Sequence, residues 1–236
     1  MKSLKLFAIA LTVAIAGTFS SSACHAQIVE ITGGQISIDL DTDSMGELAG
    51  IGLTFTGATN NVRSDRGGDF IGFDINPREG MPSPLTTFAF EASDLTTAEG
   101  TVETLGTIGF SLEAGFLSVP LSFGNFQIGF DDVRVGGSNS GFFGVSNTSD
   151  FEGVVFDISN QIRPIITDSS FTFEGDIFVS EELATLPLLA GAVAGTRIGT
   201  IAIDATVTAI PEPTSVGCIA ILGIATALRR RRKSLI

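Results

Sequence analysis

Residues 35–41 read Gln-Ile-Ser-Ile-Asp-Leu-Asp, and this stretch decides the fold class. Isoleucine and leucine at every second position alternate with serine and aspartate. A period of two is typical of a β-strand with one buried and one solvated face. The same alternation returns further along the chain, in residues 126–130, 171–173 and 201–207. We therefore expect antiparallel strands in which the phenylalanines and aliphatic residues form the core.

Turn residues separate these strands throughout the chain. Glycine and asparagine pairs fall between the alternating stretches, at Gly33-Gly34, Asn60-Asn61, Gly67-Gly68 and Gly136-Gly137. Such pairs favour tight turns. No rhythm of strand, helix and strand appears. The sequence therefore predicts an all-β fold, a single antiparallel β-sandwich or flattened barrel with about ten to twelve short strands.

Two stretches interrupt the strand pattern. Ser180 can cap a short helix that begins with Glu181 and Glu182, because acidic residues suit the first turn of a helix. Leucine-rich residues follow up to Leu186, before a proline. The three prolines within residues 76–84 predict a long loop there.

The amino terminus has the pattern of a secretion signal. Lys2 and Lys5 precede an apolar run over residues 6–17 and a small polar stretch over residues 20–23. We predict a signal peptide over residues 1–26 with cleavage after Ala26. The alternative, a lipoprotein signal at Cys24, needs an apolar residue where the chain has Ser21.

The carboxyl-terminal residues 211–236 form a second distinct segment. Pro211, Glu212 and Pro213 end any preceding strand, because proline lacks an amide donor. An apolar run over residues 216–228 then predicts a short transmembrane helix. A basic cluster follows it, which the positive-inside rule places in the cytoplasm: Arg229, Arg230, Arg231, Arg232 and Lys233.

This order of features closely resembles the PEP-CTERM sorting tail of Gram-negative bacterial surface proteins. The resemblance implies that an exosortase-type transpeptidase recognises Pro211, Glu212 and Pro213, and that the basic cluster acts as a membrane stop. It also implies transient residence in the inner membrane, followed by a location at the cell surface or outside the cell, in association with exopolysaccharide. The tail predicts where the protein goes and leaves open what the exported part, residues 27–210, does there.

Residues 27–210 have an unusual composition. They contain 25 acidic side chains and six arginines, a net charge of −19, and lack histidine, cysteine, lysine, tryptophan and tyrosine. Serine–histidine and cysteine–histidine catalysis, Schiff bases, disulfides and zinc sites built on histidine or cysteine are therefore excluded. The strong negative charge also excludes nucleic acid as a partner.

One acidic stretch has the spacing of a calcium loop. Asp39, Asp41 and Asp43 occupy alternate positions, as in an EF-hand. However, Ser44 stands where that loop needs glycine, and Gly50 where it needs a bidentate glutamate. A solvated strand face explains the three aspartates more simply. We therefore expect no cofactor and no specific metal site, with calcium as the alternative.

Glycoside hydrolysis needs only two carboxylates, so the missing histidine does not exclude it. The candidate carboxylates are Asp74, Asp131, Asp132 and Glu152. Such sites usually hold the sugar on tryptophan or tyrosine, which the chain lacks. We therefore expect a non-catalytic protein, with a carboxylate-only glycan hydrolase or a calcium-dependent carbohydrate-binding module as alternatives.

A last charged cluster surrounds Gly67-Gly68. It contains Arg63, Asp65, Arg66 and Asp69. We interpret it as an ion-paired surface turn rather than a ligand site.

Overall fold

The computed structural model describes residues 27–43, 46–48, 51–114, 117–159, 164–189 and 192–210. Within these ranges, no helix is long and apolar enough to cross a membrane. The predicted signal peptide with Ala26 and the predicted sorting tail, residues 211–236, lie outside the described residues.

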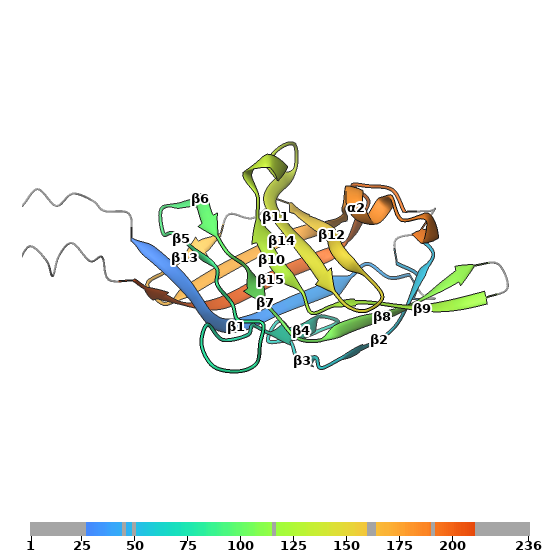
Figure 1. Cartoon of the computed structure of the whole chain (residues 1–236), viewed down its shortest axis with the longest axis horizontal. Helices are drawn as coiled ribbons and strands as arrows, with labels where there is room; N and C mark the ends of the chain where they lie inside the picture. Colours follow the sequence, from blue (N-terminus) through green and yellow to red (C-terminus); the bar gives the residue numbers. More distant parts are fainter. Residues whose placement is uncertain are drawn as a thin grey trace, which may run out of the picture.

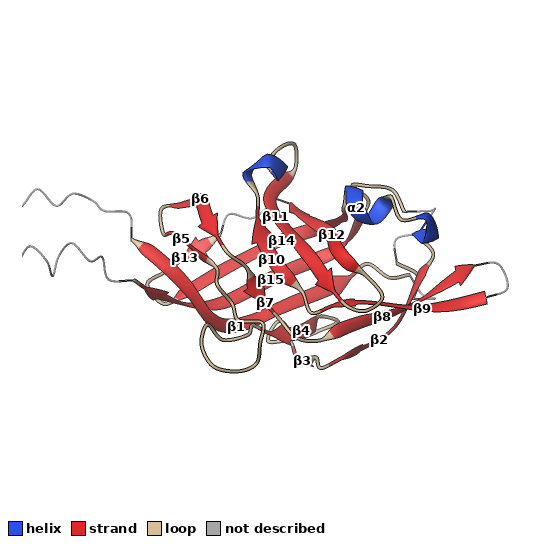
Figure 2. Cartoon of the chain, viewed as in Figure 1, coloured by secondary structure: helices blue, strands red, loops and turns tan. Residues whose placement is uncertain are grey.

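The described part is built from two antiparallel sheets and a few helical turns (Figures 1 and 2). The large sheet contains twelve strands: β1 (Ile28–Leu40), β3 (Val62–Arg63), β4 (Ile71–Asp74), β5 (Ala89–Glu91), β6 (Asp94–Glu99), β7 (Val102–Glu103), β10 (Gln127–Phe130), β11 (Asn139–Asn147), β12 (Glu152–Ser159), β13 (Ile165–Ile166), β14 (Ser170–Val179) and β15 (Arg197–Ala209). The small sheet contains β2 (Leu53–Thr59), β8 (Thr107–Ala114) and β9 (Leu117–Gly124). The helical turns are η1 (Asp132–Arg134), α2 (Glu181–Ala184) and η2 (Pro187–Leu189). The predicted all-β fold is confirmed.

The alternating stretches lie side by side as neighbouring strands. Ile36 of β1 pairs with Ile203 of β15, which pairs in turn with Phe173 of β14. All three side chains are buried. Because side chains alternate between faces, the intervening acids Glu174 and Asp204 lie on the opposite face of the same strands. The period-two pattern therefore determines which residues of each strand face the core.

The core is one cluster of mainly aliphatic and phenylalanine side chains, contributed by both sheets. The phenylalanine rings contact one another in pairs, for example Phe142 and Phe173, with ring centroids 4.9 Å apart. The expectation that phenylalanine is a core residue is confirmed. A cavity of about 40 Å³ remains between the sheets, and its lining is entirely apolar. It is smaller than the cavities of about 150 Å³ that admit benzene.

The large sheet is open, and no closed barrel forms. Its strand order runs β3-β4-β1-β15-β14-β12-β11-β10-β7 and therefore has two ends. One isolated bridge, between Ile75 and Thr104, joins the segments that follow β4 and β7. We call this junction the seam. The flattened-barrel alternative is thus replaced by an open sheet with a small second sheet packed against it.

Both predicted interruptions of the strand pattern are present. Ser180 caps α2, and its hydroxyl accepts a hydrogen bond of 3.0 Å from the Leu183 amide. The helix ends at Ala184, earlier than expected, and the Thr185 amide donates to the carbonyl groups of Glu181 and Leu183. Residues 76–84 contain no strand or helix, as expected.

Candidate functional site

An open groove lies between the turn that joins β10 to β11 and helix α2. Its volume is about 560 Å³. Residues from four parts of the chain line it: Asp131, Val133, Arg134 and Asn139 from the turn, Asp157 from β12, Phe178, Val179, Glu181 and Glu182 around α2, and Ala194 and Gly195. Figure 1 shows this turn and α2 projecting from the same side of the large sheet.

Local hydrogen bonds fix both walls of the groove. Asp131 caps η1 by accepting a hydrogen bond of 2.9 Å from the Val133 amide. This cap sets the direction of the turn that carries Arg134. On the other wall, the Ser180 hydroxyl donates to the Val154 carbonyl at 2.7 Å, which ties the start of α2 to β12.

Arg134 connects the two walls. Its Nη1 donates to Asp157 Oδ1 at 2.7 Å, and its Nη2 pairs with Glu182 Oε1. The guanidinium also lies 5.0 Å from the centroid of the Phe143 ring, a cation–π contact. Burial lowers the pKa of Arg134, but the hydrogen bonds to Asp157 and Glu182 outweigh it, so the pKa lies above its ordinary value. Arg134 is therefore charged at any physiological pH.

The groove carries an excess of negative charge. Four carboxylates, of Asp131, Asp157, Glu181 and Glu182, face a single guanidinium. Two of these carboxylates hold Arg134, and the Asp131 side chain caps η1. Such a field attracts cations and repels anions.

The structure separates the carboxylates proposed for glycoside hydrolysis. Asp131 lies in the groove, and Asp132 follows it in η1. Asp74 ends β4, where it pairs with Gln35 of β1. Glu152 begins β12, five residues before Asp157, a distance of about 17 Å along a strand.

Asp157 was missed by reasoning from the sequence. It interrupts the apolar run of β12, between the buried residues Phe156 and Ile158. An acid inside such a run is a signal of a paired buried charge, because a lone buried carboxylate is costly. Its partner Arg134 lies 23 positions earlier, and only the pairing of β12 with β11 brings the two together.

Two of the three aspartates of the candidate calcium loop, Asp41 and Asp43, have other roles. Asp41 pairs with Arg197, which also donates to Asp176 Oδ1 at 2.7 Å. Asp43 Oδ1 accepts a hydrogen bond of 3.0 Å from the Glu47 amide. Among the described residues, no group of three or more acids, histidines or cysteines is placed to hold a metal ion. The strand interpretation also needs one correction, since β1 ends at Leu40 and Asp41 lies beyond it.

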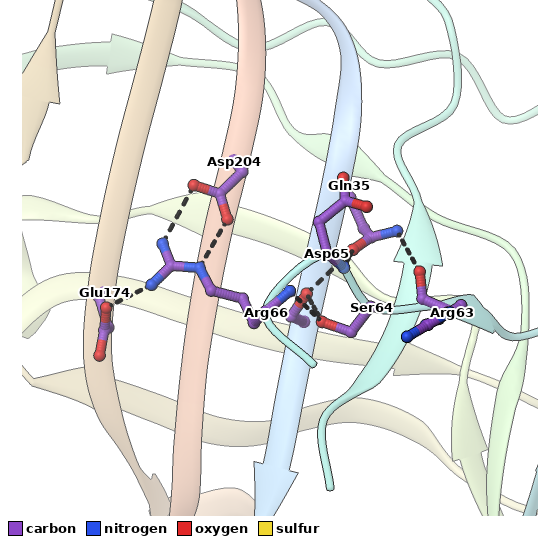
Figure 3. Close-up of polar contacts among 8 residues, drawn as sticks. Gln35, Arg63, Ser64, Asp65, Arg66, Glu174 and Asp204 are labelled. Atoms are coloured by element: carbon purple, nitrogen blue, oxygen red, sulfur yellow. Dashed lines mark hydrogen bonds and ion pairs between the residues drawn. The ribbon is translucent and has the colours of Figure 1, made fainter. Parts of the chain in front are cut away.

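The cluster around Gly67-Gly68 is ion-paired, but its partners lie on the sheet rather than within the turn (Figure 3). Arg66 Nη1 donates to Glu174 at 2.7 Å, and Nε and Nη2 both donate to Asp204. Gln35 of β1 accepts from the Asp65 amide at 2.9 Å and donates to the Arg63 carbonyl at 3.1 Å. These contacts hold the turn against the outer face of β1, β14 and β15.

The predicted sorting residues Pro211, Glu212 and Pro213 and the basic cluster Arg229–Lys233 lie outside the described residues. No family model matches the chain, and no curated protein matches it. Among solved structures, the chain is similar to the C-terminal domain of HtaA from Corynebacterium glutamicum. The identity is 14% and the TM-score 0.45, over 76% of this chain and 99% of that chain. Both values are too low for a shared function to be inferred.

Proposed function

We propose that this chain is an exported, non-catalytic protein of the cell surface or extracellular matrix, and that its acidic β-domain retains cations within secreted polysaccharide. One observation carries the second part of the proposal: Arg66, Arg78, Arg134 and Arg197 are each paired with the domain's own acids. The negative charge that remains has no internal counterpart of comparable size.

Each ion pair joins an arginine to acids of another segment of the domain. Arg66 holds Glu174 and Asp204, Arg134 holds Asp157 and Glu182, and Arg197 holds Asp41 and Asp176. Arg78 pairs with Glu30. Each of these arginines links segments of the fold, so its charge is used to hold the domain together. Acidic side chains outnumber arginines in residues 27–210, so a net negative charge remains that attracts mobile cations and basic partners.

The export part of the proposal rests on the two terminal segments. A signal peptide cleaved after Ala26 and a PEP-CTERM-like tail support Sec export and exosortase processing. The test is the intact mass of the protein recovered from the cell surface. We expect a mature protein that begins at Gln27 and ends near Pro211. A mature pool that still carries residues 229–236 would contradict exosortase processing.

A matched variant tests the recognition residues themselves. Replacing Pro211, Glu212 and Pro213 with alanine should leave the unprocessed chain in the inner-membrane fraction. Replacing three exposed residues of the domain, Thr96, Thr97 and Glu99, with alanine should leave processing unchanged. Equal processing of both variants would show that the three tail residues are not recognised.

The groove favours a second candidate, a carboxylate-only glycan hydrolase, because several carboxylates line one open space of about 560 Å³. A screen of soluble glycans for new reducing ends tests it. The informative variant combines Asp131→Asn with Glu181→Gln, since neither residue holds Arg134. Loss of hydrolysis in this variant would establish the enzyme. Absence of hydrolysis in the unmodified protein would favour the non-catalytic proposal.

A further inference from the structure

Glu103 occupies an anomalous position at the seam of the large sheet. Val102 of β7 pairs with Ile128 of β10, and both are buried in the core. Glu103 is the next residue and pairs with Gln127, so its side chain lies on the opposite, outward face. Even so, Glu103 is only 3% exposed.

The segment of residues 76–86, which we call the strap, is hydrogen-bonded to the main chain of Glu103. The Asn76 amide donates to the Glu103 carbonyl at 2.7 Å, and the Glu103 amide donates to Thr86 Oγ1 at 3.1 Å. Asn76 Nδ2 closes the strap by donating to the Pro84 carbonyl at 2.7 Å. Both Asn76 and Thr86 are buried. Both ends of the strap are therefore hydrogen-bonded to the main chain of Glu103, one through the Asn76 amide and the other through the Thr86 hydroxyl.

The carboxyl group itself is incompletely satisfied. Thr101 Oγ1 donates to Oε1 at 2.5 Å, whereas Oε2 is buried and makes no hydrogen bond to any described residue. Burial raises the pKa of Glu103, and hydrogen bonds from Thr101 and Gln127 oppose this effect in part. An ionised carboxylate at this position would be costly, because the carboxyl group is buried and Thr101 and Gln127 compensate the burial only in part.

Charged groups on the surrounding elements do not offset that cost. Among the described residues, Glu103 forms no ion pair, and the strap's own Arg78 pairs with Glu30 of β1. The other charged groups on these elements are acidic: Glu79 of the strap, Asp74 at the end of β4, Glu91 of β5, and Asp94 and Glu99 of β6. β10 contributes the neutral Gln127.

We propose that Glu103 is a pH-responsive latch: its neutral form keeps the strap closed over the seam, and its ionisation favours an open strap in which the carboxylate reaches water. The direction of the pH effect follows from the linkage between protonation of Glu103 and closure of the strap. For an acid whose pKa is raised in the closed state, the stabilisation of that state is fully present below the open-state pKa. It is lost as the pH rises through the closed-state value.

Hydrogen exchange of the full chain between pH 4 and pH 8 tests the latch. Exchange rates are first corrected for the intrinsic effect of pH. We then expect the protection of residues 76–88 and 101–104 to fall as the pH rises, while that of β14 and β15 stays constant. Each unit by which the pKa is raised corresponds to a tenfold change in the opening equilibrium. Protection that does not change with pH, or that falls equally in the whole sheet, would overturn the proposal.

Two variants sharpen the test. Glu103→Gln mimics the neutral carboxyl, so its strap should stay protected across the pH range, whereas the exposed Glu99→Gln control should follow the unmodified protein. Thr101→Val removes a donor that favours the ionised form and should move the transition to higher pH. Thr101→Val tests whether Glu103 is the titrating group even if Glu103→Gln does not fold. A transition at the same pH in Thr101→Val and the unmodified protein would show that Glu103 is not the titrating group.

Discussion

Arg66 forms two hydrogen bonds with Asp204: Nε lies 2.8 Å from Oδ2, and Nη2 lies 3.0 Å from Oδ1. The two residues are 138 positions apart in the chain. The pair fastens the turn after β3 onto the outer face of β15, and the Nη1 contact with Glu174 extends this hold to β14. Hydrogen bonding to Asp204 is the main reason that the pKa of Arg66 lies above its ordinary value.

Arg66→Ala should lower the free energy of unfolding by about 1 kcal/mol, as measured by urea denaturation. The effect is modest because the side chains of Arg66 and Asp204 are 27% and 37% exposed and water screens the pair. Arg63→Ala is the matched control, since Arg63 contacts Gln35 through its backbone carbonyl, which the substitution retains. Equal losses in the two variants would show that the Asp204 pair contributes nothing.

Arg134→Met should cost more, about 3 kcal/mol, because it leaves the Asp157 carboxylate unpaired in a largely buried position. Adding Asp157→Asn should restore most of the loss, since the uncompensated charge is then gone. Asp41→Asn provides the comparison: its pair with Arg197 is 46% and 41% exposed, Arg197 keeps its bond to Asp176, and the loss should be less than about 1 kcal/mol. A double variant no more stable than Arg134→Met would contradict the paired-charge explanation.

Gly144→Ala should destabilise the domain by about 1–3 kcal/mol, because the added methyl group would lie 2.2 Å from Cζ of the buried Phe156 ring. Gly129→Ala should cost less, since the nearest atom is 2.9 Å away on Phe143, which is only half-buried. Combining Gly144→Ala with Phe156→Leu should recover part of the loss. Thermal melting measures all three, and a neutral Gly144→Ala would show that β11 and β12 separate easily.

Millimolar calcium and magnesium should raise the melting temperature alike, because both screen a charge of −19 without a specific site. Asp41→Ala should weaken the domain slightly through loss of the Arg197 pair, with or without calcium. A calcium-specific rise that Asp41→Ala abolishes would instead establish a site at Asp39, Asp41 and Asp43.

Local patterns in the sequence predicted the features that depend on neighbouring residues. Alternation in residues 35–41 and 201–207 predicted the strands β1 and β15, because side-chain direction repeats every two residues. Ser180 followed by two glutamates predicted α2, because a cap needs only its own turn. The absence of histidine, cysteine and lysine from residues 27–210 excluded whole classes of chemistry before any coordinates were known.

The tertiary structure alone decided which distant residues meet. The groove forms only because the turn at Asp131 lies opposite Glu182. Arg66 can bind both Glu174 and Asp204 only because β14 and β15 are neighbours. The hydrogen bonds between the strap and Glu103 require residues 76–86 to lie against β7. Strand order and loop path determine all three, and the free energy that selects them is the sum of many contacts distant in sequence. A pattern of period two specifies which face of a strand is buried, but not which strand lies beside it.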